Sequence, residues 1–450
     1  MQRFIKFFSF IFLVMLAFNT IANAHNLKFL PEKSVDVLTH NIEKRGFVSV
    51  PLDYAKSSSQ KLKIFYRLIP VNGGAATDES KPVIVVINGG PGIPSSGYRA
   101  YDYDYKKLPA DKLSNLTKQF RVLIMDQRGT AGNSTALDME ADDLDYVAIA
   151  KYFSADFIAR DMQAVLDDAG IGKNTPFYII SQSFGGLVGF QYMRQPEITR
   201  KPNGIIFSSA AQPFEDPVTF AEHRRSAQKV LNLQLRQHTP EIAKLVADLK
   251  QHFSEVGLKP ELVNTLWKGL GFGKDGEWQK ALIAQIKEMM TMDKQALDKF
   301  VRESVGTPNM LNFVLSSSNM TPGWTDTTLS KQAMQDIPFE SWMLDECAMY
   351  VDAAIGDSRD ARNMRRMDAN PPAPTPFGTA EDNKTAIHQV PVLFTFGDND
   401  AMTPADASME HMFKYFYIPN KTKYVKLAGG HQAIFTEDGV KYLADWIRNI

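Results

Sequence analysis

The fold of this chain is decided by residues 177–186, whose sequence is FYIISQSFGG. The four residues 177–180 are apolar, which is typical of a strand buried on both faces of a parallel sheet. Ser183 follows almost at once, and Gly185 and Gly186 open a helical pattern that runs to about Arg194. A serine between a buried strand and a helix predicts a sharp turn that exposes its hydroxyl at the positive end of the helix.

Apolar runs of the same kind lie on both sides of this stretch. They alternate with helical spacing, for example between Ser154 and Gly170, until about residue 212. Alternation of strands and helices predicts a doubly wound, mostly parallel sheet. The predicted strands are residues 47–50, 62–69, 83–87, 122–125, 177–180, 204–207, 392–396 and 424–427.

The alternation stops after residue 212 and resumes near residue 388. Helical spacing dominates between these points, and Thr239-Pro240 is expected to open one helix of the insertion. A proline-rich stretch at 371–376 indicates an extended connector. We therefore divide the chain from residue 25 onward into a first core part (25–212), a helical insertion (213–387) and a second core part (388–450).

Composition excludes several classes of protein. The chain has 450 residues, with 50 Lys and Arg against 51 Asp and Glu, so its formal net charge is −1. This balance gives no reason to expect a nucleic-acid partner or an anionic membrane surface. Cys347 is the one cysteine, which excludes an intrachain disulfide and a cysteine-based zinc or iron–sulfur site.

The first 24 residues have the pattern of a secretory signal peptide. Arg3 and Lys6 precede an apolar run at 7–18, and Ala22-Asn23-Ala24 is a small-x-small cleavage site. The alternative is an uncleaved membrane anchor, although the run is short for a bilayer. Cleavage after Ala24 predicts an exported protein, periplasmic or secreted, with no stable membrane insertion.

Nucleophilic catalysis by Ser183 requires a base to take its proton and a carboxylate to orient that base. Of eight histidines, only His431 follows a late predicted strand on a glycine-rich loop. The preceding predicted strand ends in Gly397-Asp398-Asn399-Asp400, so the chain order is serine, acid, histidine, as this type of fold requires.

An oxyanion site is the third requirement of such chemistry. One donor is expected to be the backbone N–H of Phe184, directly after Ser183. We assign the second to the N–H of Gly90, in the loop Asn88-Gly89-Gly90-Pro91-Gly92 that follows the strand at 83–87. Glycine lets such a loop approach a substrate closely.

Together these motifs resemble the α/β-hydrolase family of proline iminopeptidases and tripeptidyl aminopeptidases. Residues 89–92 resemble the end of its H-G-G-P-G loop, with Asn88 in place of histidine, and 126–134 resemble its D-Q-R-G-T-G-x-S segment. Residues 181–186 resemble G-x-S-x-G-G, with Ser181 in place of the first glycine. Residues 397–404 resemble G-x-x-D-x-x-x-P, which selects Asp400 over Asp398 as the acid. Gly430-His431 resembles the G-H of the family, and the segment Val50–Tyr54 resembles the opening of its longer, exported members.

The resemblance implies an α/β-hydrolase fold with a helical cap domain inserted after the sixth core strand. It implies a serine aminopeptidase that removes a proline-type residue, or a di- or tripeptide, from short peptides with a free N-terminus. Ser183, Asp400 and His431 would form the triad, with no metal or organic cofactor. An acid must bind the substrate amine; Glu346 is the first candidate and Glu215 the second.

Two other functions stay open at this stage, as does the oligomeric state. The same triad on this fold would also serve the hydrolysis of esters, lactones or other amides, because fold alone does not determine substrate. A non-catalytic binding protein would be expected to lack a triad member or an oxyanion glycine, and here none is missing.

Overall fold

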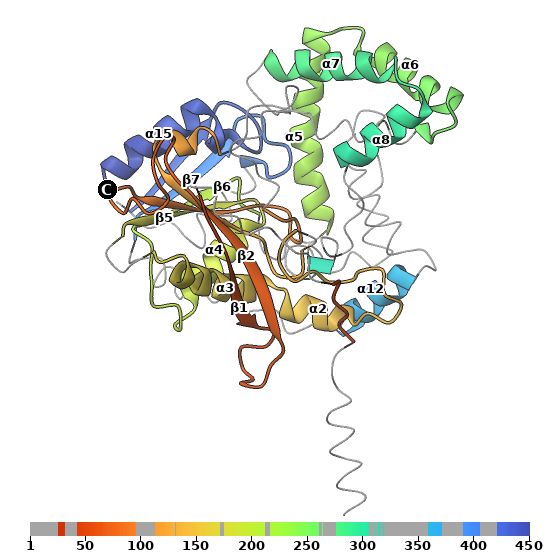
Figure 1. Cartoon of the computed structure of the whole chain (residues 1–450). Coiled ribbons are helices and arrows are strands. Elements are labelled where there is room, and N and C mark those ends of the chain that lie inside the picture. The colour runs from red at the N-terminus through yellow and green to blue at the C-terminus, as the bar shows by residue number, and fades with distance from the viewer. Residues whose placement is uncertain are drawn as a thin grey trace, which may run out of the picture.

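An eight-stranded β-sheet forms the centre of the part of the chain described by the computed structural model (Figure 1). Its strand order is β1-β2-β4-β3-β5-β6-β7-β8. The strands are β1 (Lys44–Pro51), β2 (Lys61–Ile69), β3 (Val83–Ile87), β4 (Arg121–Met125), β5 (Phe177–Gln182), β6 (Gly204–Ser208), β7 (Val392–Gly397) and β8 (Thr422–Leu427). The described residues are 26–31, 43–95, 113–130, 132–171, 175–211, 217–260, 263, 276–305, 311, 314, 315, 318, 359–370, 390–405 and 421–450.

The sheet is parallel except at one edge. Strands β1 and β2 pair antiparallel, as do β2 and β4, whereas every pairing from β4 to β8 is parallel. The carboxyl ends of β3, β5, β7 and β8 therefore lie along one edge. Ligand sites of open parallel sheets form at this edge. The predicted strands and their mostly parallel arrangement are confirmed.

Helices cover both faces of the sheet (Figure 1). Val83, Val85 and Ile87 of β3 pack into one core cluster with α2 (Tyr146–Tyr152), α3 (Ala155–Asp168) and α4 (Gly185–Arg194). Ile84 and Val86 of the same strand pack into a second cluster with α15 (Glu437–Arg448) and the short helices η1 (Leu116–Lys118) and η3 (Ala433–Phe435). The uninterrupted apolar pattern of β3 follows from this two-sided burial.

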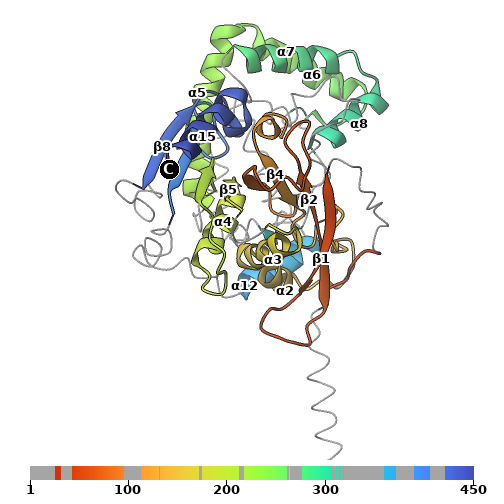
Figure 2. The ribbon, with the colours of Figure 1, turned by 60° about the vertical axis from the view of Figure 1, so that its left-hand side comes forward.

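Every secondary-structure element that the structure describes between β6 and β7 is a helix (Figure 2). Its elements are α5 (Pro217–His238), α6 (Ile242–Glu255), α7 (Glu277–Met289), α8 (Lys294–Val305) and α12 (Arg359–Ala369). The helix expected at Thr239-Pro240 begins at Ile242, and α5, which had no individual prediction, precedes it. Apolar residues of α5 to α8 form their own core around Trp278, Leu282 and Phe253.

Helix α12 lies apart from this core and packs against α2. The hydroxyl of Tyr146 in α2 donates to Asp360 Oδ1 at 2.7 Å. The guanidinium of Arg359 donates to the backbone carbonyls of Met139, Glu140 and Ala141. The far end of the insertion is thus attached to the core domain.

The segment 26–31, just after the expected cleavage site, is held on the core. Leu30 N donates to Ala136 O at 2.9 Å, and Asp138 N donates to Lys28 O at 2.9 Å. The predicted signal peptide, the proline-rich connector, Glu215 and Glu346 lie outside the described residues. Within those residues, no helix combines the length and hydropathy needed to cross a membrane.

Candidate active site

Ser183 occupies a strained turn between β5 and α4. Its φ is +55°, a left-handed conformation that non-glycine residues rarely adopt. Such strain costs on the order of 1–3 kcal/mol and persists only where the surroundings enforce it. Here Ser183 N donates to Ser208 O at 3.1 Å, and Ser183 O accepts from Gly186 N and Ala211 N at 2.8 and 2.9 Å. The side chain remains partly exposed beside the N-terminus of α4.

The close packing of this turn explains the small residues around it. A Cβ at Gly185 would overlap the carbonyl oxygen of Ile87 in β3. Ser181, which replaces the usual glycine, directs its hydroxyl at Gly189 of α4, where a Cβ would overlap it. The Ser181 hydroxyl is buried and has no hydrogen-bond partner among the described residues. Gly189 thus supplies the space that a glycine at 181 would otherwise leave.

His431 and Asp400 are brought together by the loops that follow β8 and β7. Nδ1 of His431 lies 3.0 Å from Asp400 Oδ2 and 3.2 Å from Oδ1, and both residues are 5% exposed. The carboxylate also accepts from Met402 N, Thr403 N and Thr403 Oγ1 at 2.8–3.0 Å. Because Nδ1 faces the carboxylate, Nε2 is the imidazole nitrogen left to exchange a proton.

The surroundings of Asp400 keep it ionised. Burial raises the pKa of its carboxyl. The charge and hydrogen bond of His431 and the Thr403 N–H lower this pKa by a larger amount, so the net pKa lies below the usual value. Asp398, the other candidate acid, instead accepts from Gly429 N at 2.8 Å and so holds the loop that carries His431.

The loop after β3 packs directly on Ser183. A Cβ at Gly89 would overlap Ser183 Cβ and lie 2.9 Å from its Oγ. Gly90 has a φ of +68°, which a glycine adopts without strain. The backbone N–H groups of Gly90 and Phe184 donate to no other residue within the described ranges. The structure therefore leaves two unused N–H donors in the immediate neighbourhood of the serine.

Asn88 stands where the H-G-G-P-G motif that this loop resembles has a histidine, and its side chain makes hydrogen bonds within the loop. Its side-chain nitrogen donates to Gly89 O and Ile93 O, each at 2.9 Å, and its oxygen accepts from the Ser95 hydroxyl. The side chain of Gln127, in the loop after β4, accepts from Gly92 N at 3.2 Å. Buried amides thus shape the loop without a histidine at position 88.

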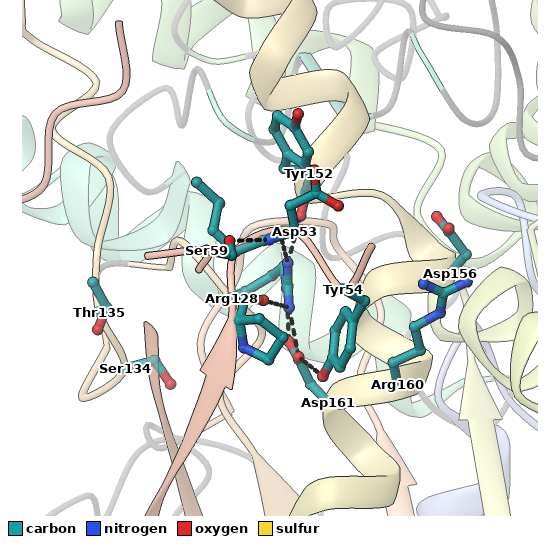
Figure 3. Close-up of polar contacts among 12 residues, drawn as sticks. Asp53, Tyr54, Ser59, Arg128, Ser134, Thr135, Tyr152, Asp156, Arg160 and Asp161 are labelled. Atoms are coloured by element: carbon teal, nitrogen blue, oxygen red, sulfur yellow. Dashed lines mark hydrogen bonds and ion pairs between the residues drawn. The ribbon is translucent and has the colours of Figure 1, made fainter. Parts of the chain in front are cut away.

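Arg128 is fully buried and ties four segments together (Figure 3). Its guanidinium forms a two-point ion pair with Asp161 of α3, at 2.7 and 2.6 Å. It also donates to the backbone carbonyls of Pro51, Leu52 and Tyr152. The Tyr54 hydroxyl donates to the same carboxylate at 2.8 Å. Sequence reasoning found the D-Q-R-G segment only as a motif; its anchoring role depends on partners distant in sequence.

The helical insertion reaches the site at the loop that carries the acid. Arg224 of α5 donates through Nε to Met402 O at 2.9 Å, and Ala401 belongs to the apolar core of α5 to α8. No local pattern in the sequence points to Arg224, because this contact joins residues 178 positions apart. The structure describes neither Glu215 nor Glu346, and its described residues hold no cluster of potential metal ligands.

Comparison with known proteins agrees with this architecture. A family model of the alpha/beta hydrolase fold matches residues 82–241, which include the loop after β3 and the serine turn. The chain has the alpha/beta hydrolase fold. With a serine at the strained turn and a His–Asp pair on the later loops, this fold is the architecture of a serine hydrolase.

Solved structures similar to this chain include three esterases or thioesterases. A thermophilic esterase from Thermogutta terrifontis with bound malate is 13% identical, with 90% of this chain and 98% of that chain covered and a TM-score of 0.37. Naproxen esterase from Bacillus subtilis is 12% identical, with 90% of this chain and 91% of that chain covered and a TM-score of 0.35. The thioesterase domain of the curacin biosynthetic pathway is 14% identical, with 90% of this chain and 100% of that chain covered and a TM-score of 0.36. No curated protein matches the sequence significantly. At such identities the substrates of these proteins do not define the substrate of this chain.

Proposed function

We propose that the protein is an exported serine aminopeptidase that hydrolyses short peptides with a free N-terminus. The observation that carries the hydrolase assignment is the strained Ser183 beside unused Gly90 and Phe184 N–H groups, directly after Gln182, whose side chain donates to the carbonyl of His431 in the His431–Asp400 pair. The peptidase assignment rests on the resemblance of the segments at 89–92 and 126–134 to the aminopeptidase motifs.

The reaction begins with attack of Ser183 Oγ on the scissile carbonyl carbon. His431 Nε2 takes the hydroxyl proton, while the ionised Asp400 stabilises the imidazolium that forms. The N–H groups of Gly90 and Phe184 bind the oxyanion, which typically accelerates such reactions by about 100- to 1000-fold per donor. His431 then protonates the leaving amine, and the C–N bond breaks to give an acyl-enzyme.

Water completes the cycle. His431 accepts a proton from the water as it attacks the acyl carbon, and the proton returns to Ser183 Oγ when the acid product leaves. The helices between β6 and β7 are proposed to serve as a cap that selects short substrates. This is in keeping with the hydrogen bond from Arg224 of α5 to Met402 O in the acid loop, and with the packing of Ala401 of that loop in the apolar core of α5 to α8. Glu346, then Glu215, remain the proposed amine-binding acids, and no cofactor is part of this proposal.

A substrate panel tests the proposal. We expect faster hydrolysis of aminoacyl and peptidyl arylamides with a free amine than of the same arylamides with a blocked amine. Ser183→Ala should abolish turnover and labelling by a fluorophosphonate probe. A preference for blocked arylamides, simple esters or lactones would reject the aminopeptidase and retain the serine hydrolase. An unlabelled Ser183 in the wild-type protein would favour a binding protein instead.

A further inference from the structure

We propose that Gln182 is a positioning residue that holds the oxyanion loop and the histidine loop in fixed relation to Ser183. Its Oε1 accepts from Gly89 N at 3.0 Å, and its Nε2 donates to His431 O at 3.3 Å. The role in catalysis rests on the proposed hydrolase function. The two loops are 93 and 249 residues away from Gln182 in sequence, so one carboxamide connects distant parts of the chain.

The chemistry of glutamine suits this position. One loop offers an N–H and the other a carbonyl, so the connecting group must accept and donate at once, as a neutral amide does. The side chain is 3% exposed, and its backbone pairs with Ser208 in β6 at the end of β5. The amide therefore projects from a rigid strand, one residue before Ser183.

The acceptor arm acts on the proposed oxyanion donor. Gly89 N is engaged by Gln182, and the next residue in the chain is Gly90, whose N–H has no acceptor within the described ranges. Gln127 holds the other end of the loop at Gly92. Without Gln182 the peptide units at Gly89 and Gly90 lose one of two fixed points. A misplacement of about 1 Å in such a site costs roughly 100-fold in rate.

The donor arm acts on the base. The carbonyl of His431 belongs to the residue whose Nδ1 is bound by Asp400, so the imidazole is held at its backbone by Gln182 and at its ring by Asp400. Loss of the donor leaves a buried carbonyl without this partner and frees the backbone of the base.

The central experiment compares Gln182→Met with Gln191→Met. Methionine has a similar length and no amide, and Gln191 is a buried glutamine of α4 whose side-chain nitrogen has no partner in the described part of the chain. For Gln182→Met we expect kcat to fall on the order of 100-fold with KM changed less than about threefold, as for an interaction made in the transition state. Gln191→Met should retain kcat within about threefold.

Hydrogen exchange measured by mass spectrometry gives a readout that does not depend on activity. Peptides that contain Gly89 and His431 should both exchange faster in Gln182→Met and remain unchanged in Gln191→Met. In Gln182→Glu, the carboxylate still accepts from Gly89 but cannot donate while ionised. Only the His431 peptide should then exchange faster, whereas a mere packing defect would affect both peptides alike.

Three results would overturn the proposal: unchanged exchange at both peptides, a kcat of Gln182→Met within about threefold of wild type, or an equal loss in Gln191→Met. If Gln182→Met does not fold, kcat and hydrogen exchange of Gln182→Glu test the proposal in its place. If the wild-type protein hydrolyses no substrate, the proposed function fails, and the exchange experiment still decides whether Gln182 connects the loops.

Discussion

Gly189 of α4 faces the hydroxyl of Ser181 in β5 so closely that a Cβ at 189 would overlap Ser181 Oγ. The two positions are therefore complementary in size, and the serine that departs from the family motif depends on a glycine one helical turn beyond the elbow. This relationship explains how the strained turn at Ser183 forms without a glycine at 181.

Gly189→Ala should destabilise the fold by about 1–3 kcal/mol, because the added methyl overfills a buried contact. Ser181→Gly in the same chain should restore most of that loss, since it removes the group that clashes. Urea denaturation of the two single variants and the double variant measures the coupling. Additive effects of the two changes would contradict the complementarity.

Asp400→Asn should lower kcat on the order of 1000- to 10,000-fold with little change in KM. The amide cannot hold the imidazole in the tautomer that leaves Nε2 free to accept a proton. Steady-state kinetics on the best substrate of the panel measures the effect. Asp398→Asn serves as the comparison, because Asp398 contacts the loop at Gly429 rather than the ring; a larger loss in that variant would refute Asp400 as the acid.

Stability should depend on the ionisation of Asp400 in acid. The folded-state pKa of Asp400 lies below its ordinary value of 3.8, so the ionised group stabilises the fold above that pH. This contribution is lost as the pH falls below 3.8 and through the lowered pKa. The difference in the free energy of unfolding between wild type and Asp400→Asn should therefore be constant above about pH 5 and shrink as the pH falls below 3.8. A difference that stays constant below pH 3.8 as well would show that Asp400 has no such shift.

Arg128→Met should cost about 3–5 kcal/mol of stability, because it leaves the buried Asp161 carboxylate without its ion pair. Combining it with Asp161→Leu should recover part of the loss. Lys244→Met breaks an exposed pair with Asp248 and should change stability by less than about 0.5 kcal/mol. Chemical denaturation measures all three variants, and equal losses for the buried and exposed pairs would argue against the anchoring role of Arg128.

On the proposal that residues 1–24 are a signal peptide, we expect the mature protein to begin at His25. Intact-mass measurement of the protein recovered from the periplasm or medium tests this cleavage. A chain that starts at His25 should have the same thermal unfolding temperature as the full-length chain. A further deletion through Leu30 should lower that temperature, because it removes the hydrogen bonds of Lys28 and Leu30 to the 136–138 segment. A retained N-terminus on the recovered protein would favour the membrane-anchor alternative.

Sequence reasoning identified the elements and the candidate residues where the signal is local. A continuous apolar run marks a buried strand, and the residue that follows it marks a loop at one edge of the sheet. Ser183, Asp400 and His431 all follow such runs, so their order and strand positions were visible in the chain. Between β6 and β7, the helical spacing after Thr239-Pro240 predicts α6, whereas α5 carries no such individual prediction.

The sequence by itself determined the parallel sheet, the turn at Ser183 and the set of residues able to meet at its carboxyl edge, because periodicity and chain order are local properties. Only the tertiary structure decided which distant groups contact one another. The pairing of Gly189 with Ser181, of Arg128 with Asp161, and of Gln182 with two loops depends on how side chains fill a shared interior. Such contacts arise from packing between segments, and no local pattern encodes them.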